Sequence, residues 1–197
     1  MPSAVPGDLK IVDSNKDGVI DDKDKIYMGS GLPKAELGLT FNATYKSFDL
    51  NIFLYSSLGL QKYNGARWMA SMAEEYHGWH KDMLNAWTPQ NTNTDIPRLV
   101  NSASHLNVRE SDLYLENASY LRINHAEFGY NLPKKLLDKI RLSAMRAFIG
   151  GENLFTFTNY KGWDPGIGGG GDSYASGIDR YPYPVARKIM LGLQVTF

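Results

Sequence analysis

Residues 36–55 read ELGLTFNATYKSFDLNIFLY and alternate apolar with polar or small side chains on either side of Lys46-Ser47. In a β-strand, successive side chains point to opposite faces, so this alternation predicts two strands that each have one apolar face. Only Lys46 and Ser47 separate the two runs, and this length is typical of a tight hairpin turn. We therefore expect an antiparallel hairpin over 36–45 and 48–55. Its apolar face carries Leu37, Leu39, Phe41, Ala43, Tyr45, Phe48, Leu50, Ile52 and Leu54.

The same alternation returns further along the chain. Residues 120–130, 143–155 and 187–197 place apolar side chains at every second position, with interruptions in the first two segments. In 120–130 the apolar phase changes after Ile123, which predicts a β-bulge near Asn124-His125. The fold class is therefore predicted to be all-β, with five antiparallel strands.

The connections between these strands have unequal lengths. Two are short, at 46–47 and 132–142, and two are long, at 59–118 and 156–186. If the strands run up and down, both short connections lie at one end of the sheet. Both long connections then lie at the other end, together with residues 1–35. Outer-membrane β-barrels have this layout, with short periplasmic turns and long extracellular loops. We therefore expect 1–35, 59–118 and 156–186 to be extracellular.

Aromatic residues support this orientation. Tyr45, Phe48, Tyr130 and Phe197 all lie at strand ends on the side of the short connections. Barrels carry such aromatic girdles at the membrane interfaces. A soluble β-sandwich also has alternating strands and loops of unequal length. The pattern alone therefore leaves this fold as the alternative to a barrel. Hydrocarbon does not tolerate open sheet edges, so five strands in a membrane must belong to a larger barrel.

The composition excludes several classes of protein. The 197 residues include 21 Lys and Arg, 21 Asp and Glu, and no cysteine. The lack of cysteine excludes disulfides, thiolate zinc sites and a cysteine nucleophile, and zero net charge argues against general nucleic-acid binding. An apolar content of 43% excludes wholesale disorder. No apolar run approaches the ~20 residues of a membrane-spanning helix, and no apolar leader follows Met1.

Residues 13–24, DSNKDGVIDDKD, match the spacing of an EF-hand calcium loop. Such a loop takes oxygen ligands at positions 1, 3, 5, 7, 9 and 12, and its sixth position is a glycine, here Gly18. Asp24 stands where the standard loop has Glu, so the choice between Ca²⁺ and Mg²⁺ stays open. A solvated acidic turn is the alternative. We expect a single loop that stiffens the surface, with the ligands Asp13, Asn15, Asp17, the carbonyl of Val19, Asp21 and Asp24.

Large apolar side chains recur at helical spacing within 59–118. Their intervals of three and four residues predict a helix over 66–87. The stripe is typical of a buried helix face, and an aromatic surface that contacts cargo or a partner is the alternative. His77 and His80 have a spacing that permits zinc, but an ordinary surface pair is the preferred interpretation. The stripe comprises Trp68, Met72, Tyr76, Trp79, Met83 and Trp87, and the candidate contact residues are Trp68, Trp79, Trp87 and Trp163.

Catalytic motifs have no support in the sequence. Gly166, Gly168 and Gly171 satisfy the pattern G-x-G-x-x-G, but Asp-Pro precedes them in place of a strand and no helix follows. No G-x-S-x-G elbow frames a serine, and no carboxylate pair stands out in a strand register. We therefore do not expect an enzyme.

A series of short motifs runs through nearly the whole chain. They are Pro6-Gly7-Asp8-Leu9-Lys10, Tyr45-Lys46-Ser47-Phe48-Asp49-Leu50, Asn93-Thr94-Asp95-Ile96-Pro97-Arg98, Ser119-Tyr120-Leu121-Arg122-Ile123, Gly129-Tyr130-Asn131-Leu132-Pro133-Lys134-Lys135, Asn153-Leu154-Phe155-Thr156, Tyr160-Lys161-Gly162-Trp163-Asp164-Pro165 and Leu191-Gly192-Leu193-Gln194-Val195-Thr196-Phe197. With these motifs in this order, the chain resembles the carboxy-terminal part of SusC/RagA-type TonB-dependent outer-membrane transporters, the nutrient importers of Bacteroidetes.

The resemblance implies a barrel of about 22 strands with a plugged lumen, in which residues 36–197 supply the last five strands. The family's plug domain and TonB-contacting segment lie upstream and have no counterpart in this chain. A SusD-like surface lipoprotein would form a lid, and TonB with ExbB and ExbD would power the import of oligosaccharides or peptides. Phe197 looks like the outer-membrane insertion signal that the BAM machinery reads. A secreted, soluble, calcium-stabilised β-module that binds carbohydrate is the competing prediction.

Overall fold

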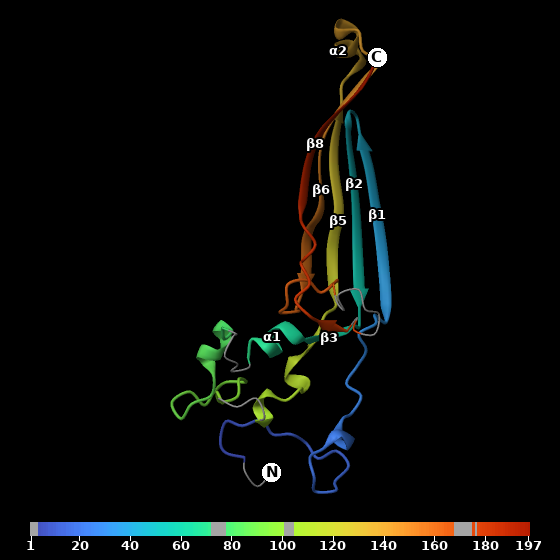
Figure 1. Ribbon diagram of the computed structural model, residues 1–197. Coiled ribbons are helices and arrows are strands. Elements are labelled where there is room, and N and C mark those ends of the chain that lie inside the picture. The colour runs from blue at the N-terminus through green and yellow to red at the C-terminus, as the bar shows by residue number, and fades with distance from the viewer. Residues whose placement is uncertain (1–3, 72–77, 101–104, 168–174, 176) are drawn as a thin grey trace.

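The computed structural model describes residues 4–71, 78–100, 105–167, 175 and 177–197. The chain forms a long five-stranded sheet and, at one end of it, a group of loops and short elements (Figure 1). We call this group the loop layer, and it comprises the described residues before 35, between 59 and 118, and between 159 and 187. Helix α2 (Lys134–Ile140) and the C-terminus lie at the opposite end of the sheet.

The five-stranded sheet confirms the predicted strands. Its spatial order β1-β2-β5-β6-β8 follows the order of the chain, and every neighbouring pair is antiparallel. The strands are β1 (Ala35–Tyr45), β2 (Phe48–Leu58), β5 (Tyr120–Asn131), β6 (Ala144–Thr158) and β8 (Lys188–Thr196).

The predicted turn and bulge are also present. Lys46 adopts a φ of 53° in the turn between β1 and β2, a left-handed conformation that closes the hairpin. The register between β2 and β5 shifts at Phe53/Leu54, and Asn124 of β5 has no paired residue in either neighbouring strand. Asn153 of β6 faces this interruption with a φ of 53°. The phase change after Ile123 is therefore a bulge that crosses two strand pairs.

The loop layer contains a second, three-stranded sheet that the sequence did not predict. Strand β3 (Gln61–Asn64) lies between β4 (Leu115–Asn117), to which it is antiparallel, and β7 (Ile178–Asp179), to which it is parallel. These strands are too short for alternation to be recognised. Short helices complete the layer: η1 (Asp22–Asp24), α1 (Gly65–Met69), η2 (Lys81–Asn85), η3 (Leu106–Val108) and η4 (Asp112–Tyr114).

The predicted continuous helix over 66–87 is wrong. Helix α1 ends at Met69, and the backbone N–H of His80 donates to the carbonyl of Ala70 at 2.9 Å. Ten residues of helix would separate these two positions by about 15 Å, so this contact is incompatible with one continuous helix. Gly78 also disfavours a helix, by about 1 kcal/mol relative to alanine. Met72, Tyr76 and His77 lie outside the described residues.

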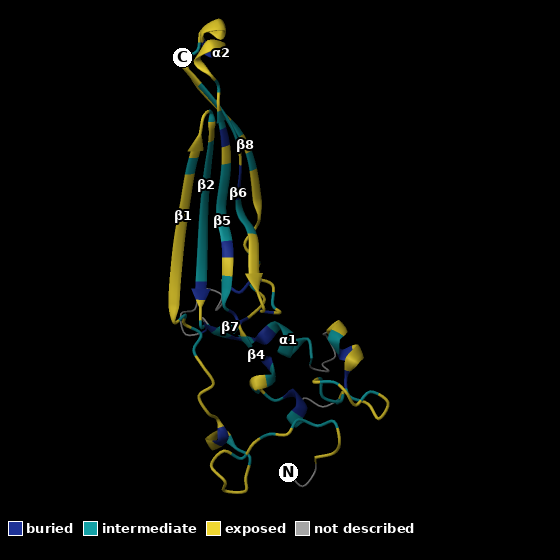
Figure 2. Ribbon diagram, turned by 180° about the vertical axis from the view of Figure 1, so that it is seen from behind, coloured by how far each residue is buried: buried dark blue, intermediate teal, exposed yellow. Residues whose placement is uncertain are grey.

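Most of the buried side chains lie in the loop layer and at its junction with the long sheet (Figure 2), and Leu137 of α2 is an exception at the opposite end. Leu60, Ala118 and Tyr160 form a buried apolar cluster there. The edge strands β1 and β8 are mostly exposed, and Leu191 of β8 is 80% exposed. The long sheet therefore has no apolar core of its own among the described residues. No helix in the described part of the chain has the length and apolar character needed to cross a membrane.

Candidate functional site

One face of the long sheet is a continuous apolar surface. The register aligns Phe41 with Ile52, Ile52 with Ala126, and Gly151 with Ile189, so one row of apolar or small residues crosses all five strands. At the end near the short turn, the rings of Phe48 and Tyr130 lie 4.9 Å apart, and those of Phe48 and Phe128 lie 5.5 Å apart. The alternation predicted for this face is confirmed. Aromatic residues lie at both of its ends, because Phe155 and Phe157 are paired with Ile123 and Leu121 near the loop layer.

The opposite face is mostly polar, although it also carries Phe53 and Phe148, and charged side chains on it are paired across strands. Arg146 of β6 donates to Glu127 of β5 at 2.7 Å and, across Gly129, to Asp49 of β2 at 3.1 Å. A Cβ atom at Gly129 would collide with the Arg146 guanidinium and the Asp49 carboxylate. Glycine therefore leaves the room that lets Arg146 bridge strands that are not neighbours. The two faces give the sheet an apolar side and a side suited to water or polar solutes.

A buried polar network joins the polar face to the loop layer. Arg122 of β5, only 7% exposed, donates to Asp164 and, at 2.9 Å, to Thr156. Asp164 also accepts the backbone N–H of Gly166 at 2.8 Å and that of Val185 at 3.3 Å. One buried carboxylate thus holds two parts of the segment 156–186 against the sheet. No sequence pattern predicted this pairing, because 42 residues separate Arg122 from Asp164.

A second buried carboxylate, Asp179, organises the neighbouring part of the network. It accepts the hydroxyl of Tyr160 at 2.6 Å and the backbone N–H of Tyr181 at 3.1 Å. Burial, followed by the hydrogen bond to Asp179, raises the pKa of the Tyr160 hydroxyl, so this group stays a donor. Lys62 is 3% exposed and donates to the carbonyl of Ile167, and burial lowers its pKa.

The motifs at residues 6–10 and 93–98 meet in a third network. Arg98 donates to both oxygens of Asp8, at 2.6 and 3.3 Å, and Asn107 donates to the same carboxylate at 3.0 Å. Burial raises the pKa of Asp8, but the hydrogen bonds from Arg98, Val5 and Asn107 outweigh burial, and the pKa is lowered. Gly7, at a φ of 89°, brings the backbone against the Trp87 ring. These two motifs therefore form one packed unit.

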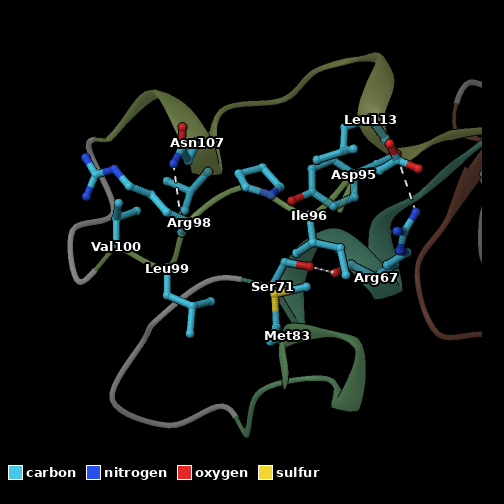
Figure 3. Close-up of a pocket in the computed structure, with 13 residues that line it drawn as sticks. Arg67, Ser71, Met83, Asp95, Ile96, Arg98, Leu99, Val100, Asn107 and Leu113 are labelled. Carbon is cyan, nitrogen blue, oxygen red and sulfur yellow. Dashed lines mark hydrogen bonds between the residues drawn. The ribbon is translucent and has the colours of Figure 1, made fainter. Parts of the chain in front are cut away.

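The small cavity beside this unit does not suit a ligand. It lies between α1, η2 and the segment 95–100, and its lining includes Arg67, Ser71 and Met83 (Figure 3). Ser71 donates to the carbonyl of Arg67 at 2.7 Å. The cavity volume of about 20 Å³ holds roughly one water molecule. It is a packing gap within the loop layer.

The acidic loop is closed on itself. Asp24 accepts the backbone N–H of Ser14 at 2.8 Å and that of Asp21 at 2.9 Å, so the two ends of the loop meet. Asp13 accepts the backbone N–H of Gly18 at 2.8 Å, and Gly18 has the φ of 84° that the sharp turn needs.

Several of the six predicted ligands bond to the backbone of the loop itself in this conformation. Asn15 and Asp17 accept backbone N–H groups within the loop, and Asp21 caps η1. Among the described residues, no group of three or more acidic or histidine side chains converges closely enough to hold a metal ion. The donor set of carboxylate, amide and carbonyl oxygens fits Ca²⁺ by its chemistry.

The four candidate tryptophans have different surroundings. Trp68 donates its indole N–H to the carbonyl of Val108 at 2.9 Å, and Trp87 packs against Gly7. Trp79 is 42% exposed and Trp163 is 70% exposed, so these two are available for contact. Phe197 follows the end of β8 and is 92% exposed. Gly168 and Gly171 of the glycine pattern lie outside the described residues.

Known proteins are similar to this chain over almost its whole length. No family model matches it. It is 33% identical to TonB-dependent receptor P3 of Formosa agariphila and 31% identical to TonB-dependent receptor SusC of Bacteroides thetaiotaomicron, in each case over 98% of the chain. The chain spans about a fifth of the length of these relatives, 19% and 18% respectively. They are named as receptors and not as enzymes, in agreement with the prediction.

Solved structures show the same fold. The RagAB peptide transporter matches 92% of this chain with a TM-score of 0.71 and 26% identity, over 20% of its own chain. The "open-open" state of the RagAB peptide importer matches 84% of this chain with a TM-score of 0.66 and 29% identity, over 17% of its own chain. The chain is accordingly a homologue of TonB-dependent receptors of the SusC and RagA type, over about a fifth of their length.

Proposed function

We propose that this chain is the part of an outer-membrane nutrient importer that supplies barrel wall and extracellular loops. The observation that carries the proposal is the long sheet with one exposed apolar face and one polar face of paired charges. An exposed apolar surface of this extent needs a covering, and a lipid bilayer provides one. The polar face then lines the lumen, and β1 and β8 are paired by further strands of the same barrel.

The relatives support import and leave the cargo open. The solved relative is described as a peptide transporter, and we propose oligosaccharides or peptides as the cargo of this protein. A SusD-like lipoprotein would act as the lid over the loop layer. TonB with ExbB and ExbD would act on other parts of the same receptor. Trp79 and Trp163, which are both exposed, are the better candidates for contact with lid or cargo.

We propose in addition that the acidic loop takes up Ca²⁺, or else Mg²⁺, when the side chains of Asp13, Asn15 and Asp17 turn from the backbone to the ion. The closed ends of the loop and the glycine turn at Gly18 support this proposal. A bound ion would stiffen residues 13–24 on the surface. Protease digestion with and without millimolar calcium tests this proposal, and calcium should protect residues 13–24 from cleavage.

The experiment that tests the main proposal is deletion of the gene for the full receptor. Cells that lack the receptor should fail to accumulate one class of labelled oligosaccharide or peptide, and the complete gene should restore uptake. The receptor should also be recovered from the outer membrane as a β-rich species whose gel mobility changes on heating. Normal uptake of every oligosaccharide and peptide tested by the deletion strain would contradict the proposal.

A further inference from the structure

Helix α2 lies in a concentration of positive charge, at the end of the sheet opposite the loop layer (Figure 1). The chain as a whole has no net charge, yet residues 133–143 contain four cations and a single carboxylate, that of Asp138. The four cations are all exposed, and no ion pair in the described part of the chain includes any of them. They are Lys134, Lys135, Lys139 and Arg141. These charges are therefore available to a partner.

The exposed face of α2 is amphipathic. Leu136 and Ile140 lie about one helical turn apart on the same face, and they are 47% and 52% exposed. With 3.6 residues per turn, Lys135 and Lys139 lie directly beside this apolar pair, whereas the buried Leu137 lies on the side opposite the two lysines. The helix thus rests on the protein through Leu137. It presents two cations next to two aliphatic side chains on its free face.

The position of α2 matches the headgroup level of a bilayer that covers the apolar face of the sheet. Strand pairing continues beyond Tyr130 to Leu132, whose N–H donates to the carbonyl of Met145 at 2.9 Å. Pro133 follows Tyr130 of the aromatic cluster by three residues, which is about 10 Å along the strand and, with the usual tilt, about 8 Å along the barrel axis. The headgroup layer on each side of the hydrocarbon is about 5–8 Å thick. Helix α2 therefore begins at the level of the headgroups.

The apolar face of the sheet continues to the residues beside α2. The backbone N–H of Ser143 donates to the carbonyl of Thr196 at 2.8 Å, so Phe197 lies next to the end of the connection that contains α2. Phe197 stands two residues after Val195, which the register pairs with Met145 on the apolar face. The exposed side chains of α2 and of the chain end thus extend the surface that we assign to lipid.

An anionic membrane surface satisfies both halves of the free face of α2. A soluble anion could pair with the lysines, but it would leave Leu136 and Ile140 in water. Neutral headgroups could receive the aliphatic side chains, but they would leave the excess positive charge without a counter-charge. Interfacial helices with this pattern bind membranes through buried apolar area together with attraction to anionic lipids. Each lysine near an anionic surface strengthens binding roughly fivefold.

We propose that α2 is an interfacial helix that binds anionic phospholipids of the periplasmic leaflet. Lys135 and Lys139 contact the phosphate groups, and Leu136 and Ile140 insert at the boundary between headgroups and acyl chains. The proposal rests on the import function proposed above, in which the loop layer is extracellular and α2 is periplasmic. Binding of this kind fixes the height of the connection between β5 and β6 relative to the membrane.

The test uses the full receptor in lipid nanodiscs, made of phosphatidylcholine alone or of an equal mixture with phosphatidylglycerol. Hydrogen exchange of residues 134–141 should be roughly 5- to 25-fold slower in the mixed discs, because two lysines contribute about fivefold each. A variant with Lys135→Gln and Lys139→Gln should lose this difference, and high salt should reduce it in the wild-type receptor.

Two matched controls separate charge at α2 from charge elsewhere. Lys135→Arg with Lys139→Arg keeps the charge and should keep the slower exchange. Lys16→Gln with Lys23→Gln removes the same number of charges from exposed positions of the acidic loop, at the other end of the molecule, and should also keep it. The heat-dependent gel shift would verify that each variant is folded.

Three results would overturn the lipid assignment. They are equal exchange of residues 134–141 in the two kinds of disc, an unchanged difference in the folded Lys135→Gln, Lys139→Gln variant, and equal slowing by glycerol 3-phosphate added to phosphatidylcholine discs. The import proposal is judged separately, by uptake in the deletion strain. A receptor that restores uptake but shows no lipid dependence at α2 would refute only the interfacial helix.

Discussion

The orientation of the long sheet can be tested with two neighbouring residues of β2. Ile52 lies on the apolar face and Asn51 on the polar face, where the register pairs Asn51 with Glu127. Ile52 is four residues from Phe48, about 14 Å along the strand. With the usual strand tilt, this places Ile52 roughly 10 Å from the aromatic girdle, close to the middle of an apolar band about 25 Å tall.

Replacement of each residue by arginine should therefore have very different effects. Ile52→Arg places a charge near the bilayer midplane, which costs about 2–4 kcal/mol in such barrels. That cost lowers the folding equilibrium constant roughly 30- to 900-fold. Asn51→Arg removes a hydrogen bond to Asn42 but places its guanidinium near Glu127. We expect Asn51→Arg to lower the free energy of unfolding by less than about 1 kcal/mol.

The assay is urea unfolding of the full receptor in lipid vesicles, followed by the heat-dependent gel shift. Ile52→Ala serves as a further control, because it separates lost apolar area from added charge. Equal destabilisation by Asn51→Arg and Ile52→Arg would contradict the assignment of the apolar face to lipid. An unfolding midpoint of Ile52→Arg at the same urea concentration as that of the wild-type receptor would contradict it as well.

Three further predictions concern the chain end and the loop layer. Deletion of Phe197 should lower the amount of full receptor in the outer membrane, whereas deletion of an exposed residue such as Leu84, 89% exposed, should not; equal surface levels in both strains would contradict the insertion role. The lowered pKa of Asp8 means that its ionised form stabilises the folded state above about pH 4. This contribution is lost as the pH falls through the folded pKa, so the protection of backbone amides at residues 5–9, 98–100 and 105–107, relative to their intrinsic exchange rates, should fall below about pH 4. The effect should be absent in Asp8→Asn, and an equal acid response in that variant would exclude Asp8 as the cause. Millimolar calcium should protect residues 13–24 from protease in the wild-type receptor but not in a variant with Asp13→Asn and Asp17→Asn, and protection in both would rule out the loop as the binding site.

The five long strands could be read from the sequence because each strand carries its own signal. Alternation with period two is local, and the turn at Lys46-Ser47 and the phase change at Asn124 are local as well. The predicted helix over 66–87 failed for a related reason. Periodicity reports which residues are apolar, but Trp68 and Trp87 find their contacts at Val108 and Gly7 in distant segments. A single helix face was not needed to bury them.

The sequence by itself determined the two-faced sheet, its strand order and the end at which the loops gather, since these follow from side-chain alternation and connection lengths. Only the tertiary structure revealed the buried pair Arg122–Asp164, the half-buried pair Arg98–Asp8 and a pocket at Tyr55, Tyr120 and Glu36. Arg98 and Asp8 are 90 residues apart in the chain. No local pattern encodes such a separation. The partners are chosen by the register of the strands and by the need to pair each charge that the loop layer buries.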